Sequence, residues 1–181
     1  MMAATGDTAT GPLSGVRVLD LTSAVLGPVA TMHLGDLGAD VIKIEPKGGD
    51  PRRTLGPARH PDMSSQFLQT NRGKRSIVLD AKTAAGREVV LRLCETADVF
   101  VHNSRPQAMQ RLGLAYEDVE RRNPRIVYCA GVGFDERGRY AGKPAYDDMI
   151  QGLAAVPALQ ARLSGAPGYV PFNLSDSLCG L

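Results

Sequence analysis

Asp176 is the side chain of this sequence best suited to covalent chemistry. It follows residues 171–175 and opens a run of small residues, 177–181, that can begin a helix. On local pattern alone, an aspartate there predicts a helix N-cap, whose side chain accepts a backbone hydrogen bond. A carboxylate at a helix N-terminus is also favoured as the anion, and the anion is the state that a carboxylate nucleophile requires. The two interpretations, N-cap and nucleophile, are compatible.

The histidines and cysteines form no metal or redox motif. The histidines share no metal-ligand spacing, so we expect each to be exposed or satisfied within the fold; they are His33, His60 and His102. The cysteines are odd in number and widely spaced, with no CxxC pair; they are Cys94, Cys129 and Cys179. This pattern favours a reducing cytoplasm over a disulfide framework or a zinc knuckle. We therefore predict no metal site, and a small buried hydrophobic role for Cys179.

Nucleotide-binding motifs are weak or absent. The turn 22–28 contains a single glycine, Gly27, where a dinucleotide fingerprint needs three to let the backbone approach a pyrophosphate. Glu45 ends the next predicted strand, where a ribose-binding acid would lie, but the turn disfavours NAD. Residues 71–75 form a dense basic run, Asn-Arg-Gly-Lys-Arg, which is usually solvated surface, with phosphate contact as the alternative.

Composition excludes several classes of protein. The 181 residues carry 21 Lys and Arg against 19 Asp and Glu, a net charge of +2, which gives no case for a nucleic-acid or anionic-membrane surface. Hydrophobic residues at 43% with 22% charged residues fit a globular domain. No apolar run is long enough to span a membrane. We expect residues 1–12 to be a disordered N-terminal tail without a signal peptide.

Short apolar runs alternate with amphipathic segments along the rest of the chain. The pattern predicts five strands, at 16–21, 40–45, 76–79, 98–102 and 125–129. It predicts helices at 29–37, 83–95, 106–112, 116–122 and 146–155, and a long surface loop at 46–62. Strands separated by helices imply an α/β fold, a Rossmann-like, doubly wound and mostly parallel sheet.

Chemistry in such a sheet gathers beyond the carboxyl ends of the strands. Five segments directly follow a predicted strand and are the places to expect a ligand: 22–27, 46–50, 80–82, 103–106 and 131–143.

An ordered set of motifs resembles the family III CoA-transferases, which include formyl-CoA and carnitine CoA-transferases and acyl-CoA racemases. The motifs lie at 13–22, 27–28, 37–45, 49–50, 71–77, 79–82, 97–99, 103–106, 111–113, 123–124, 133–134, 146–151 and 176–180. No single motif is specific to this family, but the whole set in this order is. The resemblance implies that 13–181 is the N-terminal part of a CoA-binding large domain.

The resemblance also implies a mechanism in which Asp176 is the nucleophile. Its carboxylate attacks an acyl-CoA thioester, giving an aspartyl anhydride and free CoA thiolate. The thiolate returns to the aspartyl carbonyl, which releases the donor acid and leaves an aspartyl-CoA thioester. A carboxylic acid acceptor reverses these steps. One thioester replaces another, so the reaction needs no ATP, no metal and no tightly bound cofactor; coenzyme A and acyl-CoA are substrates.

The family's CoA contacts map onto the strand-end segments. Residues 79–82 match the stretch that holds the adenosine end, Arg111 matches a basic residue that could meet phosphate, and Tyr146 would lie close to the thioester. The full set implied is Val25, Leu26, Leu79, Asp80, Ala81, Lys82, Asn103, Ser104, Arg105, Arg111, Pro144, Ala145, Tyr146 and Asp147.

Two alternatives stay open beside the transferase. Racemases of the family carry histidine at the position of Tyr146, as an acid/base group, and tend to carry glycine at that of Asn103. A tyrosine with a pKa near 10 is a poor replacement, so both positions favour a transferase. Val25 stands where formyl-CoA transferase has glutamine, which weakens a formate or oxalate assignment. The second alternative is a noncatalytic CoA-binding or dimerising fragment.

Family chains continue for about as long again and form interlocked homodimers. We therefore expect this chain to be a fragment, inactive alone, that exposes apolar surface where the missing half packs. We also expect a cytoplasmic protein whose partners are an acyl-CoA and a carboxylic acid, with no nucleic acid or membrane.

Overall fold

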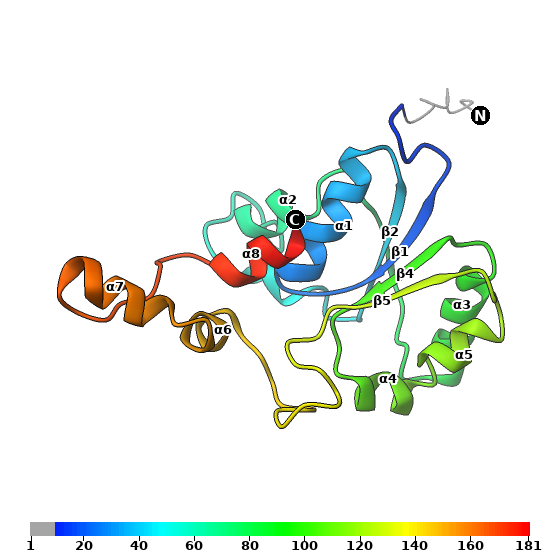
Figure 1. Ribbon diagram of the computed structural model, residues 1–181. Helices are drawn as coiled ribbons and strands as arrows, with labels where there is room; N and C mark the ends of the chain where they lie inside the picture. The colour runs from blue at the N-terminus through cyan, green and yellow to red at the C-terminus, as the bar shows by residue number, and fades with distance from the viewer. Residues whose placement is uncertain (1–9) are drawn as a thin grey trace.

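A five-stranded parallel sheet forms the centre of the molecule (Figure 1). The computed structural model describes residues 10–181, so most of the predicted tail lies outside the described residues. The strand order is β3-β2-β1-β4-β5, and each neighbouring pair is parallel. The strands are β1 (Arg17–Leu21), β2 (Asp40–Glu45), β3 (Arg75–Val78), β4 (Val99–His102) and β5 (Val127–Ala130).

Both faces of the sheet are buried along its central strands β1, β2 and β4. Successive strand residues point to opposite faces, so Val18 and Val41 pack in one core cluster while Leu19 and Phe100 pack in the other. Burial on both sides explains why the strands are short apolar runs rather than alternating apolar and polar positions.

Helices cover the two faces and confirm the predicted doubly wound α/β class (Figure 1). On one side lie α1 (Leu26–Asp36), α2 (Ser65–Thr70) and α8 (Leu174–Gly180). On the other lie α3 (Ala84–Cys94), α4 (Pro106–Leu112) and α5 (Tyr116–Glu120). The helices α6 (Asp147–Leu153) and α7 (Val156–Ser164) extend away from the sheet. None of the helices described at 10–181 has the length and hydropathy to cross a bilayer.

Local signals set several helix ends. The Thr83 hydroxyl accepts the backbone N–H of Gly86 at 3.0 Å and so caps α3. Gly113 adopts φ +65° just after α4, the left-handed conformation that glycine provides without a side-chain clash. The predicted end of this helix at Leu112 is therefore confirmed.

The structure differs from the predicted elements most clearly at three places, while other element ends shift by one or two residues. The loop expected at 46–62 contains a 3₁₀ turn, η1 (Pro51–Thr54), and α2 follows it. The helix expected at 146–155 ends at Leu153, because Ala155 takes φ +60° and Pro157 lies in the first turn of α7, which begins at Val156. The helix expected from Val29 starts three residues earlier, at Leu26.

The direction of strand order reverses between β1 and β4. From β1 the chain adds β2 and β3 on one side, and then β4 and β5 on the other. Leu21 pairs in register with His102, and His102 with Ala130, so the three strands end level with one another. This switch point is where an open parallel sheet leaves room for a ligand.

Candidate functional site

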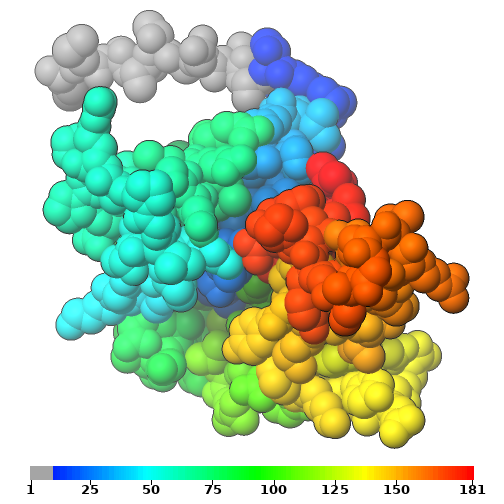
Figure 2. All heavy atoms as spheres, turned by 90° about the vertical axis from the view of Figure 1, so that its left-hand side faces the viewer, coloured from blue at the N-terminus to red at the C-terminus, as the bar shows by residue number. Residues whose placement is uncertain are grey.

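A cavity of about 510 Å³ opens beyond the carboxyl ends of β1, β4 and β5. Its walls come from the turn 23–26, the start of α4, the segment 130–146 and one face of α8. Figure 2 shows the last two segments lying close together with α6 on one face of the molecule. The cavity therefore lies at the switch point of the sheet, as the strand-end argument predicted.

Asp176 lines this cavity from the first turn of α8. The N-cap position is held by Asn173, so the predicted N-cap role of Asp176 is wrong by three residues. The backbone N–H of Asp176 donates to Asp147 Oδ1 at 3.0 Å. The half-buried Asp176 side chain is left to face the cavity.

The environment raises the pKa of Asp176 rather than lowering it. Burial is the main cause, the Asp147 carboxylate adds to it, and Arg52 opposes both. We expected the helix N-terminus to favour the anion, but α8 has only seven residues and a neighbouring acid at that end. A carboxylate of raised pKa is a stronger nucleophile once it is deprotonated.

Two glycines allow close packing around the turn after β1, Gly180 between α8 and α1 and Gly27 within the turn itself. A Cβ on Gly180 would lie 2.8 Å from both the carbonyl oxygen of Leu26 and the Cβ of Val29, so only glycine permits this close approach of α8 to α1. A Cβ on Gly27 would lie 2.4 Å from that of Thr22. The contact places Asp176 beside the 23–26 turn.

Asn103 holds that turn in place. Its Oδ1 accepts the backbone N–H of Ser23 at 3.0 Å, and its Nδ2 donates to the Ser23 carbonyl at 2.7 Å. The next residue, Ala24, has φ +68°, a conformation that costs energy in a residue with a side chain. Asn103 lines the cavity, but its amide is engaged in fixing the cavity wall.

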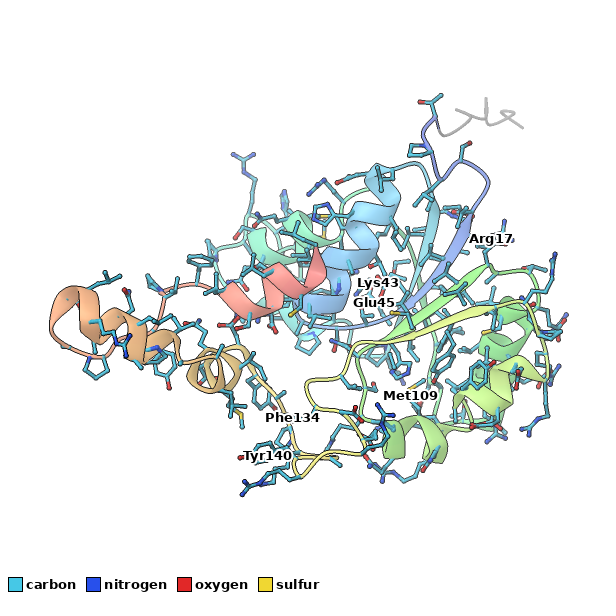
Figure 3. The ribbon with its side chains drawn as sticks, in the orientation of Figure 1. Arg17, Lys43, Glu45, Met109, Phe134 and Tyr140 are labelled. Atoms are coloured by element: carbon cyan, nitrogen blue, oxygen red, sulfur yellow. The ribbon has the colours of Figure 1, made fainter. Side chains whose placement is uncertain are left out.

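Two cationic side chains share the cavity with Asp176. Arg105 and Lys143 line it, with Glu136 as an acidic neighbour. Phe134 also lines the cavity, and its ring packs 5.4 Å from that of Tyr140 within the segment between β5 and α6 (Figure 3). The arrangement offers cations to an anionic ligand and an apolar wall to the rest of it.

The structure brings together eight of the residues expected from the resemblance. Those that line the cavity are Val25, Leu26, Asn103, Arg105, Pro144, Ala145, Tyr146 and Asp176. Asp147 is buried beneath Asp176, and Ser104 and Arg111 are not among the lining residues.

The stretch 79–82 also lies outside the cavity, at the end of edge strand β3. Two strand spacings, about 10 Å, separate β3 from β1. Only an extended ligand could touch both places, so an adenosine contact at 79–82 stays a prediction.

Sequence reasoning missed some residues at the site. Lys143 was recognised only as part of a strand-end segment, and no local signal distinguishes it from other exposed lysines. Cys179 is exposed and lines the cavity, so its expected burial is wrong. The signal was available, since Cys179 follows Asp176 by three residues and so shares its helix face. Of the three histidines, only His102 is buried, and burial lowers its pKa.

The basic run at 71–75 hides a buried ion pair. The Lys74 side chain is 2% exposed, and its Nζ donates to Asp20 Oδ2 at 2.9 Å. It also donates to Asn71, Thr31 and the Pro28 carbonyl. The prediction that residues 71–75 are solvated surface is therefore wrong for Lys74, which connects β1, α1 and the loop before β3. Burial lowers the pKa of Lys74 to about 8, although Asp20 opposes it.

Glu45 belongs to a second buried network and cannot bind a ribose. Its Oε1 accepts from Arg53 at 2.6 Å and from Ser76 at 2.5 Å, and its Oε2 accepts from Arg53 Nε at 2.7 Å and the Asp50 backbone at 3.0 Å. Nearby, Lys43 pairs with Asp50 at 3.0 Å; Figure 3 shows Lys43 and Glu45 close together on β2. Burial opposes ionisation, but these donors outweigh it and lower the pKa of Glu45 to about 2.

Comparison with known proteins assigns a family to this architecture. A family model described as CoA-transferase family III matches residues 13–181. A succinate–glutarate CoA-transferase of Agrobacterium fabrum is 40% identical over 177 residues, which cover 94% of this chain and 44% of that protein. An acetyl-CoA:oxalate CoA-transferase of Acetobacter aceti is 42% identical over 171 residues, with the same coverage.

Comparison with solved structures supports the same family assignment. The crystal structure of a CaiB/BaiF family protein from Brucella suis matches with a TM-score of 0.87 and 38% identity, covering 93% of this chain and 46% of that one. This chain therefore spans less than half the length of the relatives it matches.

Proposed function

The chain belongs to CoA-transferase family III, and from that premise we propose that it carries the nucleophile of a CoA-transferase. The reaction moves CoA from an acyl-CoA donor to a carboxylic acid acceptor. The observation that carries the proposal is the half-buried Asp176 carboxylate facing a 510 Å³ cavity at the switch point of the sheet.

The chemistry begins when an Asp176 oxygen attacks the thioester carbonyl. A C–O bond forms, the C–S bond breaks and the electron pair leaves on the CoA sulfur, which gives an aspartyl anhydride. The thiolate then attacks the aspartyl carbonyl and expels the donor acid as its carboxylate. The resulting aspartyl-CoA thioester is opened by the acceptor carboxylate through the same two steps in reverse. A carboxylate serves because its anhydride can be attacked at either carbonyl.

The walls of the cavity suit an acyl-CoA. Val25 and Leu26 give an apolar surface beside Asp176, and Tyr146 closes another side. Arg105 and Lys143 can pair with phosphate groups. We propose that residues 79–82 receive the far end of the molecule and that Arg111 and Ser104 lie along its path.

Tyr146 supports transfer over racemisation. A racemase must remove and return a proton on opposite faces of the α-carbon, which needs two groups that titrate near neutral pH. Histidine is the side chain whose ordinary pKa lies in that range, and this chain has tyrosine at the position. Assembly as a homodimer and residence in the cytoplasm are further proposals from the family.

The test is covalent capture of Asp176. A chain completed with the C-terminal part that its relatives carry is incubated with an acyl-CoA and quenched with hydroxylamine, and the peptide containing Asp176 is analysed by mass spectrometry for the hydroxamate. We expect capture in the wild-type chain and none in Asp176→Asn, while Asp148→Asn, an exposed acid on α6, leaves capture unchanged. Saturable CoA binding without capture would instead identify a noncatalytic CoA-binding protein.

A further inference from the structure

Two buried side chains of α6 hold the segment that leads into α8. Asp147 is 8% exposed and Gln151 is 2% exposed. Asp147 Oδ1 accepts the backbone N–H of Asp176 at 3.0 Å, and its Oδ2 accepts Gln151 Nε2 at 2.6 Å. Gln151 Oε1 accepts the backbone N–H of Val170 at 2.9 Å. The pair therefore fastens both ends of residues 170–176 to α6.

Asp147 makes these bonds with both oxygens of its carboxylate. Both of its hydrogen-bond donors are neutral, and none of the ion pairs within residues 10–181 includes it. A buried carboxylate without a cation is costly. An asparagine here could still accept the Asp176 N–H, although its NH2 would then face the NH2 of Gln151. The charge has a second consequence, because it lies next to the Asp176 carboxylate.

We propose that Asp147 and Gln151 are positioning residues for Asp176, and that the Asp147 charge promotes acylation of Asp176. The second half of this inference rests on the proposed function. Before attack, two carboxylates lie side by side. When the Asp176 oxygen bonds to the acyl carbon, its negative charge passes to the departing sulfur, and the repulsion from Asp147 is relieved. Asp147 therefore destabilises free Asp176 relative to the acyl-enzyme.

Other charged groups also act on Asp176. Arg52, from η1, attracts its carboxylate and so opposes Asp147. Arg105, Lys143 and Glu136 also line the cavity, and together they carry a net positive charge that favours an anionic ligand. Burial raises the pKa of Asp176 most, and the charge of Asp147 raises it further.

The decisive comparison is Asp147→Asn against Asp148→Asn in the 181-residue chain. Both substitutions remove one acid from the first turn of α6, but the Asp148 side chain is exposed. Carbon-13 NMR of labelled aspartates follows the titration of Asp176, identified by loss of its signal in Asp176→Asn. We expect the pKa of Asp176 to fall in Asp147→Asn and to stay unchanged in Asp148→Asn. An unchanged pKa in Asp147→Asn overturns the electrostatic role, whether or not the chain transfers CoA.

Gln151→Met tests the positioning without touching the charge. Methionine keeps the volume of glutamine but loses the bonds to Asp147 and Val170. We expect faster hydrogen exchange at the Val170 and Asp176 amides, and a hydroxylamine capture rate that is lower by about tenfold. Unchanged exchange at both amides overturns the positioning role. Absence of capture in the wild-type chain would count against the proposed function alone, since exchange and titration do not depend on it.

Discussion

Glu45→Gln removes a charge from the most heavily bonded carboxylate in the structure. Glu45 is 1% exposed and accepts four hydrogen bonds, two of them from the Arg53 guanidinium. These donors hold its pKa at about 2 in the folded chain, against 4.5 when free. The folded state therefore binds the proton less readily than the unfolded state, so ionised Glu45 stabilises the fold.

The size and pH range of this effect follow from the two pKa values. Their difference corresponds to about 3 kcal/mol of stability, present in full above pH 4.5 and lost as the pH falls through 2. The variant should therefore be about 3 kcal/mol less stable than the wild type at pH 7, and the difference should shrink to about 1 kcal/mol at pH 3.

Urea unfolding followed by circular dichroism at pH 7, 5, 4 and 3 measures this difference. Glu88→Gln is the matched control, because Glu88 pairs with Arg122 at the surface, where it is 49% exposed. A surface pair of this kind contributes no more than about 1 kcal/mol. A constant difference between Glu45→Gln and the wild type from pH 7 to pH 3 would refute the linkage between Glu45 ionisation and stability.

Two further substitutions test the elements that support the cavity. Lys74→Met leaves Asp20 buried without its paired lysine and should lower the free energy of unfolding, measured by urea unfolding, by about 3–5 kcal/mol. The control Arg75→Met removes one partner of an exposed ion pair and should lower it by less than about 1 kcal/mol. Equal losses in the two variants would contradict a special contribution of the buried pair. Asn103→Ala removes both hydrogen bonds to the Ser23 backbone and should raise the Kd for CoA about tenfold, as measured by calorimetry. An unchanged Kd would show that the turn keeps its shape without the Asn103 side chain.

The sheet was predictable from sequence because its signal is local. The predicted range 40–45 matches β2 residue for residue, since its apolar and β-branched run is buried on both faces. α2 was not predicted. It is only six residues long and depends on Ser64, whose hydroxyl accepts the Phe67 N–H, and on Arg53, which lies 3.8 Å from the Phe67 ring centre. Such contacts form only when the fold brings η1 and α2 together.

The residues of the site were predictable in type but not in environment. Asp176 was identified as a carboxylate at a helix N-terminus, but the helix begins earlier and its backbone is bonded to Asp147, 29 residues away. Lys74 was expected at the surface, and its burial depends on Asp20, 54 residues away. Spacing in sequence carries no information on either pair, so the charge balance of the site could come only from the structure.

The position of Asp176 depends on packing far from its own side chain. α8 reaches the 23–26 turn because Gly180 lets it approach α1, and α6 fixes its first turn through Asp147. The turn itself is held in a strained conformation by Asn103. Three separate parts of the chain therefore determine where one carboxylate points, and a family resemblance that matches only local motifs identifies this residue without describing its surroundings. Its raised proton affinity follows from burial beside a second acid, which no motif around Asp176 encodes.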